Sequence, residues 1–292
     1  MYIHLNGQIV EEKEASLSVF DHGFMYGLGL FETFRVYQGH PFLLHDHLDR
    51  LRSGLNELNI RWEFSNQQIL SFVQKLLEVN GLEDAYVRLN VSAGVGGIGL
   101  MTDVYEEPTT IIYIKPIPSM LDSKKGVILN IPRNTPEGSY RLKSHHYLNN
   151  ILAKRELGPD PSLEGVFLTA DGKVAEGIVS NIFWVCDNIL YTPSVDTGIL
   201  NGITRQFIIK LLKANGVSIV EGKYDLNNLY NSTEVFVTNS IQEIVPISGI
   251  GNLLFKGKNG EITQKLQREY NNMKRLLFTM DDYVGRFDIG DD

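Results

Sequence analysis

Residues 31–60 read FETFRVYQGHPFLLHDHLDRLRSGLNELNI, and the spacing of the apolar side chains changes within this stretch. Its first half predicts a pair of short strands that turn at Gly39. Its second half predicts a helix with one apolar face, because leucines recur at intervals of three and four: Leu48, Leu51, Leu55 and Leu58. The stretch therefore predicts a strand pair followed by a helix.

The flanking segments continue this mixture of strands and helices. MYIHLNG (1–7) predicts a strand that ends in the hairpin pair Asn6-Gly7. A second helix is expected over 65–81, with Ser65 or Asn66 as its cap and Asn80-Gly81 as its stop. AYVRLNVSAG (85–94) and TTIIYIK (109–115) predict two further strands.

The stretch PIPSMLDSKKG (116–126) has two prolines and a charge cluster, so we predict a linker there. After it the pattern restarts, with helices expected at 146–158, 203–216 and 261–280 and strands at VILNIP, EGVFLTA, SNIFWVC, ILYTP and EVFVTNS. Mixed order with many hairpins predicts an α+β fold, not a doubly wound parallel sheet. The expected domains are 1–115 and 127–292, and the acidic tail from residue 281 is expected to be loosely held.

Bulk composition excludes several classes of function. The chain has 292 residues, a formal net charge of −8 and one cysteine, Cys186. An electrostatic nucleic-acid binder needs surplus Lys and Arg, and a disulfide framework needs paired cysteines. The beginning has no signal-peptide pattern and no apolar run is long enough for a membrane span, so we expect a cytoplasmic protein.

Two eye-catching motifs have ordinary explanations. GVGGIG (94–99) matches a dinucleotide fingerprint, but Pro108 and the lack of a helical period after it favour a glycine loop between two strands. The pairs His45/His47 and His145/His146 lack a third ligand at a recognisable spacing. No metal site is therefore expected.

Three features are typical of phosphate binding. Thr204 lies in the first turn of the helix expected from Ile203, where backbone N–H groups attract anions. Ser240 and Glu243 have capping-box spacing, which predicts a second helix N-terminus around Asn239 and Ser240. Arg50 offers a fixed positive charge. For each feature taken alone, plain helix capping and surface charge are the favoured explanation.

Lys143, in RLKSHHYLNN (141–150), is a candidate nucleophile. A lysine nucleophile must be neutral, which requires desolvation or a cationic neighbour. Arg141 lies on the same face if this segment is a strand. A lone lysine is usually a solvated surface charge, and spacing alone favours that interpretation over a nucleophile.

Six stretches, in this order and spacing, resemble the fold-type IV pyridoxal 5'-phosphate enzymes, which include branched-chain and D-amino-acid aminotransferases and 4-amino-4-deoxychorismate lyases. The stretches are FDHGFMYGLGLFETFR (20–35), HLDRL (47–51), RLKSHHYLNNILAKREL (141–157), EGVFLTADGKVAEGIVSNIFWV (164–185), TGILNGITRQF (197–207) and EVFVTNSIQEIVPI (234–247). The resemblance implies a two-domain fold with a smaller N-terminal α/β domain and a larger C-terminal pseudobarrel domain. NTPEGSYRLKSHHYLNN with FETFR most resembles the bacterial lyases.

The resemblance also implies roles for single residues. Lys143 matches the lysine that binds the cofactor as a Schiff base and acts as general base. Glu176 matches the carboxylate that pairs with the pyridine nitrogen. The residues that match the family's contacts to the cofactor phosphate are Arg50, Ile203, Thr204, Asn239 and Ser240. Tyr147 matches a tyrosine that bonds the phenolic oxygen in some members, and His145 and His146 become shaping residues.

Three positions depart from relatives: Gly27-Leu28-Gly29 replaces Gly-Asp-Gly, Phe31 replaces a tyrosine, and Ile98 replaces an arginine. They argue against a D-amino-acid aminotransferase and leave the ligands of the substrate carboxylates open, with Arg88, Arg141, Lys115 or a partner subunit as candidates. The resemblance implies a homodimer that converts aminodeoxychorismate to 4-aminobenzoate and pyruvate. An aminotransferase with the same site, or a binding protein that kept the fold, are the alternatives.

Overall fold

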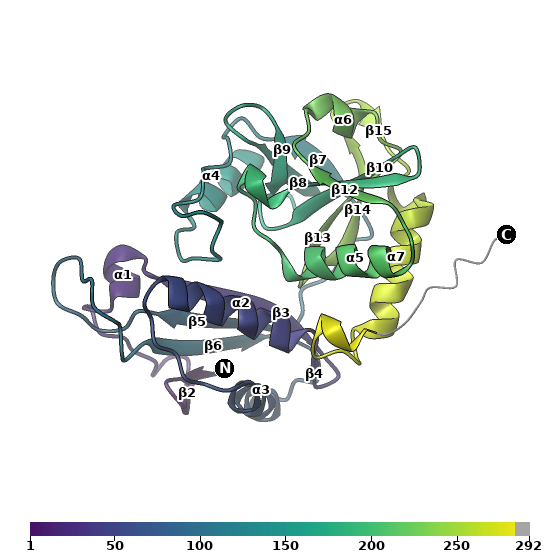
Figure 1. Cartoon of the computed structure of the whole chain (residues 1–292). Coiled ribbons are helices and arrows are strands. Elements are labelled where there is room, and N and C mark those ends of the chain that lie inside the picture. The colour runs from purple at the N-terminus through teal and green to yellow at the C-terminus, as the bar shows by residue number, and fades with distance from the viewer. Residues whose placement is uncertain (284–292) are drawn as a thin grey trace. The chain divides into compact units, whose positions relative to one another are not determined.

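The computed structural model describes residues 1–283, which form two compact units (Figure 1). Unit 1 comprises Met1–Pro118, Leu142–His146 and Lys274–Asp282, and unit 2 comprises Ser119–Arg141, Tyr147–Met273 and Tyr283. The first division falls inside the predicted linker, 116–126. The chain then returns to unit 1 twice, which the single boundary between 1–115 and 127–292 does not include. Most of the predicted acidic tail lies outside the described residues.

Unit 1 contains an antiparallel sheet of six strands in the order β2-β1-β6-β5-β3-β4. The predicted hairpin at Asn6-Gly7 is confirmed, since both residues have positive φ (47° and 90°), which suits a tight turn. The strands are β1 (Tyr2–Leu5), β2 (Gln8–Glu11), β3 (Gly29–Tyr37), β4 (His40–Pro41), β5 (Ala85–Ser92) and β6 (Thr109–Lys115).

Three helices belong to unit 1: α1 (His22–Tyr26), α2 (Leu44–Glu57) and α3 (Asn66–Asn80). Ser65 caps α3 with a complete capping box, and Gly81 ends it in the left-handed conformation, so both predicted signals are confirmed. The apolar face of α2 is buried in the core with Phe34 of β3. This packing fixes which side chains of β3 face α2.

Unit 2 is built on a nine-stranded sheet in the order β12-β11-β10-β13-β14-β7-β8-β9, with β15 added to β14. Antiparallel pairs mix with parallel ones, such as β14 with β7, which confirms the predicted α+β class. The strands are β7 (Lys124–Ile128), β8 (Leu163–Leu168), β9 (Val174–Gly177), β10 (Asn181–Cys186), β11 (Ile189–Pro193), β12 (Ile219–Gly222), β13 (Glu234–Asn239), β14 (Glu243–Ile250) and β15 (Leu253–Leu254).

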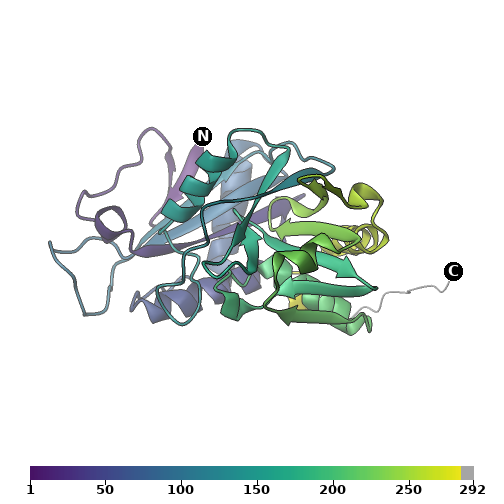
Figure 2. The same cartoon turned by 90° about the horizontal axis from the view of Figure 1, so that it is seen from above.

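The helices of unit 2 are α4 (Leu148–Leu157), α5 (Ile203–Ala214), α6 (Leu226–Tyr230) and α7 (Glu261–Met273). In Figures 1 and 2, α5 and α7 lie along the sheet, where they pack on β13. The helix predicted over 261–280 is shorter than expected and ends at Met273. Within residues 1–283, no helix has the length and apolar character that a membrane span requires.

The structure differs from the predictions for unit 2 at two places. The linker expected over 116–126 includes the beginning of β7, at Lys124. The second helix N-terminus expected around Asn239 and Ser240 is instead the turn between β13 and β14, and Glu243 begins a strand. Capping-box spacing is a short-range pattern, and the pairing of two long strands outweighs it here.

The glycine motif 94–99 lies in the loop between β5 and β6, and no helix follows it in that loop, so the predicted glycine loop is confirmed. Gly94 has φ +81°, and a Cβ there would lie 2.0 Å from the carbonyl oxygen of Glu107. A Cβ on Gly96 would lie 2.4 Å from His22 Nε2. Gly94 and Gly96 are therefore needed for close packing.

We expect Gly94→Ala to destabilise the protein by about 1–3 kcal/mol, because both the positive φ and the close carbonyl oppose a side chain. Urea denaturation followed by circular dichroism measures this change. Gly97→Ala is the matched control, because a Cβ there has nothing within 4 Å. It should change the free energy of unfolding by less than about 0.5 kcal/mol. Equal effects of the two changes would contradict the packing explanation.

Candidate active site

Lys143 is positioned in unit 1 by backbone hydrogen bonds to the beginning of β3. Phe31 N–H donates to the Lys143 carbonyl at 2.9 Å, and His145 N–H donates to the Gly29 carbonyl at 3.0 Å. The Lys143 side chain is half-buried, with Nζ 4.6 Å from the centre of the Phe31 ring. The lysine is thus held on an ordered segment against an aromatic face, unlike a typical surface lysine.

Two more basic side chains surround the same ring. Arg88 has its guanidinium carbon 3.7 Å from the centre of the Phe31 ring, and His145 stacks on the ring at 6.3 Å. Burial, aided by the charge of Arg88, lowers the pKa of His145 to about 4, so its imidazole is neutral at physiological pH. Arg88 is therefore the cation that lies over the same Phe31 ring as Lys143. Arg141, the neighbour considered from the sequence, lies in no strand and belongs to unit 2.

Arg50 of α2 forms a two-pronged ion pair with Glu32 of β3. Arg50 Nε and Nη2 each lie 2.7 Å from a Glu32 carboxylate oxygen, and His47 Nδ1 lies 2.6 Å from Oε2. Burial is the largest single influence and raises the pKa of Glu32, but the charges and hydrogen bonds of Arg50 and His47 together outweigh it and lower that pKa to about 2. The sequence analysis missed Glu32. The signal that could have revealed it is its spacing in β3. Glu32 lies two residues from both Leu30 and Phe34, so its carboxylate is on the same buried face of the strand.

The lowered pKa of Glu32 predicts an acid-dependent loss of stability. The folded pKa of about 2 lies below the ordinary value of 4.5. The contribution, about 3 kcal/mol, is therefore present above pH 4.5 and is lost as the pH falls towards 2. We expect Glu32→Gln to lower the free energy of unfolding by about this amount at pH 7 and by progressively less below pH 4.5.

Urea denaturation of wild type and Glu32→Gln between pH 7 and pH 2 checks this prediction. Glu63→Gln changes an exposed carboxyl of the same unit and should have little effect at any pH. A stability difference between wild type and Glu32→Gln that stays constant over the whole pH range would contradict the ion-pair explanation.

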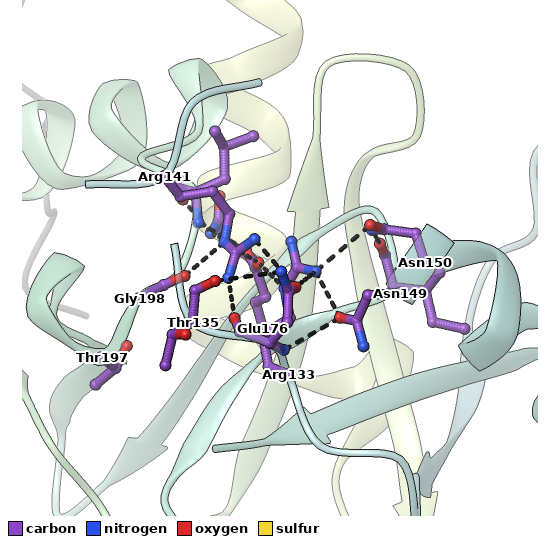
Figure 3. A network of polar contacts seen from close by, with 12 residues as sticks. Arg133, Thr135, Arg141, Asn149, Asn150, Glu176, Thr197 and Gly198 are labelled. Carbon is purple, nitrogen blue, oxygen red and sulfur yellow. Dashed lines mark hydrogen bonds and ion pairs between the residues drawn. The ribbon is translucent and has the colours of Figure 1, made fainter. Parts of the chain in front are cut away.

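Glu176, at the end of β9 in unit 2, is a buried carboxylate held by several donors (Figure 3). Arg133 Nε donates to Oε1 at 2.8 Å, and Leu200 N–H donates to Oε2 at 3.0 Å. Arg141 Nε lies 3.8 Å from Oε1. Two guanidinium groups and a backbone N–H thus fix the orientation of this carboxylate.

The two arginines are themselves tied to helix α4 and to the loop before α5. Arg133 Nη1 donates to Asn149 Oδ1 at 2.7 Å, and Arg141 Nε donates to the Gly198 carbonyl at 2.6 Å (Figure 3). Burial and the nearby Arg133 lower the pKa of Arg141 to about 10, which still leaves it charged at neutral pH. The sequence analysis missed Arg133, which has no local pattern that marks it.

The predicted phosphate contacts of unit 2 come together at the N-terminus of α5. Thr204 Oγ1 and Ser240 Oγ lie 3.3 Å apart, although they are 36 residues apart in the sequence. The N-cap of α5 is Gly202, and Ile203 is the first helical residue. A Cβ on Gly202 would lie 2.1 Å from Asn181 Oδ1, so only glycine fits here. The Asn239 side chain instead stabilises the β13–β14 turn, where its Oδ1 accepts N–H bonds from two turn residues.

Tyr147 is at the N-cap of α4, and its carbonyl accepts the Ile151 N–H bond at 3.0 Å. Its assignment to the cofactor's phenolic oxygen remains a prediction. Of the predicted site residues, unit 1 carries Lys143 and Arg50, whereas unit 2 carries Glu176, Ile203, Thr204, Asn239, Ser240 and Tyr147. Among residues 1–283, no group of three His, Cys, Asp or Glu side chains could hold a metal ion.

The chain belongs to the class IV aminotransferase family, whose family model matches residues 29–250. It is 50% identical over 272 residues to the aminodeoxychorismate lyase of Bacillus subtilis (strain 168), an alignment that covers 92% of this chain and 93% of that protein.

Solved structures of the family resemble this chain over nearly its whole length. The 4-amino-4-deoxychorismate lyase of Pseudomonas aeruginosa superposes with a TM-score of 0.82 at 27% identity, covering 93% of this chain and 98% of that one. The branched-chain amino acid aminotransferase of Thermobaculum terrenum, in its PLP-form, gives a TM-score of 0.81 at 27% identity and covers 94% of each chain.

Proposed function

We propose that the protein is a pyridoxal-phosphate-dependent aminodeoxychorismate lyase, which splits 4-amino-4-deoxychorismate into 4-aminobenzoate and pyruvate. The observation that carries this proposal is the 50% identity to a lyase over 92% of the chain. The reaction redistributes the atoms of one substrate between two products and needs no oxidant, water or amino acceptor. It also gains aromatic stabilisation, so a second half-reaction is unnecessary.

The side chains of the two units suit this cofactor. The hydroxyls of Thr204 and Ser240 and the N-terminus of α5 provide donors for a phosphate dianion, and Arg50 provides a positive charge. Glu176 is a carboxylate that would hold the ring nitrogen, and Lys143 is a primary amine that would bind the aldehyde covalently. The donors and acceptors present therefore match the groups of pyridoxal phosphate.

When bound, pyridoxal phosphate supplies an electron sink for the carbanion that forms at C4 of the substrate. Lys143 would hold the cofactor covalently and, when released from it, would act as the base that removes the C4 proton through its Nζ. Glu176, whose orientation is fixed by Arg133 and a backbone N–H, would pair with the ring nitrogen of the cofactor. The Lys143 ammonium returns the proton to the departing enolpyruvyl group, which leaves as pyruvate.

One incubation separates lyase from aminotransferase. Purified protein with aminodeoxychorismate and no keto acid should release equal amounts of pyruvate and 4-aminobenzoate, detected by coupled reduction of pyruvate and by fluorescence. A branched-chain aminotransferase would consume L-valine or L-isoleucine only when an acceptor such as 2-oxoglutarate is present. Activity of the second kind alone would overturn the proposal. A protein that stays colourless with the cofactor would indicate a binding protein.

We further propose that the enzyme is a cytoplasmic homodimer. Supporting this, two segments of unit 1, residues 17–24 and 95–100, expose seven apolar side chains: Leu17, Val19, Phe20, Phe24, Val95, Ile98 and Leu100. The segments are linked by a hydrogen bond from Gly96 N–H to the Phe20 carbonyl, 3.1 Å long. Exposed apolar side chains that form a patch usually mark a protein interface. Light scattering after size-exclusion chromatography measures the molar mass, and a monomer would contradict the proposal.

A further inference from the structure

Unit 2 contains a buried ion pair to which the proposed chemistry assigns no role. Lys124 Nζ on β7 lies 2.6 Å from Glu164 Oε2 on β8, and the two side chains are only 8% and 5% exposed. Desolvation makes buried ion pairs poor net stabilisers, but they fix the position of the groups bonded to them. The neighbours of this pair therefore show what it holds in place.

Both ends of the ion pair are bonded to turns that carry proposed cofactor contacts. Lys124 Nζ donates to Gln242 Oε1 at 3.1 Å, and Gln242 ends the turn that contains Ser240. Ser180 Oγ donates to Glu164 Oε1 at 2.7 Å, in the turn that follows Glu176. This ion pair is thus bonded to two segments. One follows Glu176, the proposed partner of the ring nitrogen, and the other contains Ser240, whose hydroxyl is proposed to bind the phosphate.

The Ser240 turn needs such support, because its backbone is strained. β13 and β14 pair at Asn239 and Glu243, which leaves three residues for the turn. Glu243 has φ +63°, a left-handed conformation that normally favours glycine. Asn239 Oδ1 accepts the N–H groups of residues 241 and 242 from inside the turn, and Lys124 is a fixed cation that holds Gln242 from β7.

We propose that Lys124, paired with Glu164, is a positioning residue that holds the β13–β14 turn through Gln242, so that Ser240 is presented to the cofactor phosphate. This inference rests on the proposed function, which places the phosphate at Ser240 and Thr204. Its expected consequence is specific. Loosening the turn should weaken the binding of the phosphate group and leave covalent capture of the aldehyde by Lys143 unchanged.

The test compares two probes that differ only in the phosphate. Apoprotein is titrated with pyridoxal phosphate and with pyridoxal, and the Schiff-base absorbance gives a dissociation constant for each. Gln242→Met keeps the size of the side chain but cannot accept the Lys124 bond. We expect it to weaken pyridoxal phosphate binding about tenfold and to leave pyridoxal binding unchanged. The affinity of the apoprotein for inorganic phosphate should fall in parallel.

A matched control exists on α7, where Gln267 Nε2 donates to the Ile244 carbonyl at 3.0 Å, close to the same turn. Gln267→Met should leave the ratio of the two dissociation constants unchanged. Lys124→Met combined with Glu164→Gln removes both charges together, keeps an acceptor for Ser180 and should reproduce the Gln242→Met result. This second variant tests the ion pair without leaving one charge buried alone.

The outcomes separate the inference from the function on which it rests. If wild-type protein binds the two probes equally, the phosphate assignment itself is wrong. If wild type prefers pyridoxal phosphate and both the Gln242→Met and double variants keep that preference, the positioning role of Lys124 is overturned. A preference lost in these two variants and kept in Gln267→Met supports it.

Discussion

Replacing Lys143 with alanine is expected to abolish covalent cofactor binding and to lower turnover by about a thousandfold or more, since the change removes both the anchor and the base. Borohydride reduction followed by peptide mapping should find the phosphopyridoxyl mass on the Lys143 peptide of wild type and nowhere on the variant. The absorbance band of the bound cofactor should also disappear. Because the side chain is only half-buried, the fold should survive.

Lys274→Ala is the matched control for this experiment. Lys274 is also half-buried in unit 1, and its Nζ lies 5.0 Å from the centre of the Tyr37 ring, much as Lys143 lies over Phe31. Losing that cation–π contact should leave turnover and labelling unchanged. Labelling that persists in Lys143→Ala would disprove the assignment of the lysine, and with it the proposed mechanism.

The second large effect is expected for Glu176→Gln. A neutral amide cannot stabilise a protonated ring nitrogen as a carboxylate does, so turnover should fall by roughly a hundredfold to a thousandfold, while Lys143 still binds the cofactor. Steady-state kinetics and the cofactor spectrum of the same preparation check both halves of this prediction. A fully active variant would remove the role assigned to Glu176.

Stability must be separated from chemistry in this variant, because Glu176 also neutralises Arg133 and lies near Arg141. Glu234→Gln provides the comparison. Glu234 is a buried carboxylate of the same unit that accepts the Thr263 N–H bond at 2.9 Å, at the beginning of α7. We expect it to lower the free energy of unfolding without the loss of turnover. If the two folded variants lose turnover to a similar extent, the effect of Glu176→Gln is structural.

Sequence patterns predicted the elements whose signals are local. The capping box at Ser65, the turn at Asn6-Gly7 and the leucine spacing of α2 each lie within one element and its ends, and all three predictions are confirmed. The pattern around Ser240 failed because the same spacing suits a helix cap and a strand turn. Only the pairing of β13 with β14, and of β14 with the distant β7, resolves that ambiguity.

The resemblance named the residues expected to touch the cofactor, but it did not reveal the residues that hold them. Glu32, Arg133 and Lys124 carry no motif. Each is found only through a charged partner, at separations of 18, 43 and 40 residues in the sequence. Buried charges require partners, so a single buried carboxylate such as Glu32 signals that a partner exists without identifying it.

By itself, the sequence determined the α+β class and the positions of most helices and strands. It also indicated the family of the chain, through which Lys143 and Glu176 were singled out. Only the tertiary structure decided that Arg50 is bound by Glu32, that two arginines flank Glu176, and that a buried ion pair is hydrogen-bonded to the Ser240 turn. The physical reason is that periodicity and capping act over a few residues. Which charges meet depends instead on the order and register of strands, and these are set by the packing of the whole unit.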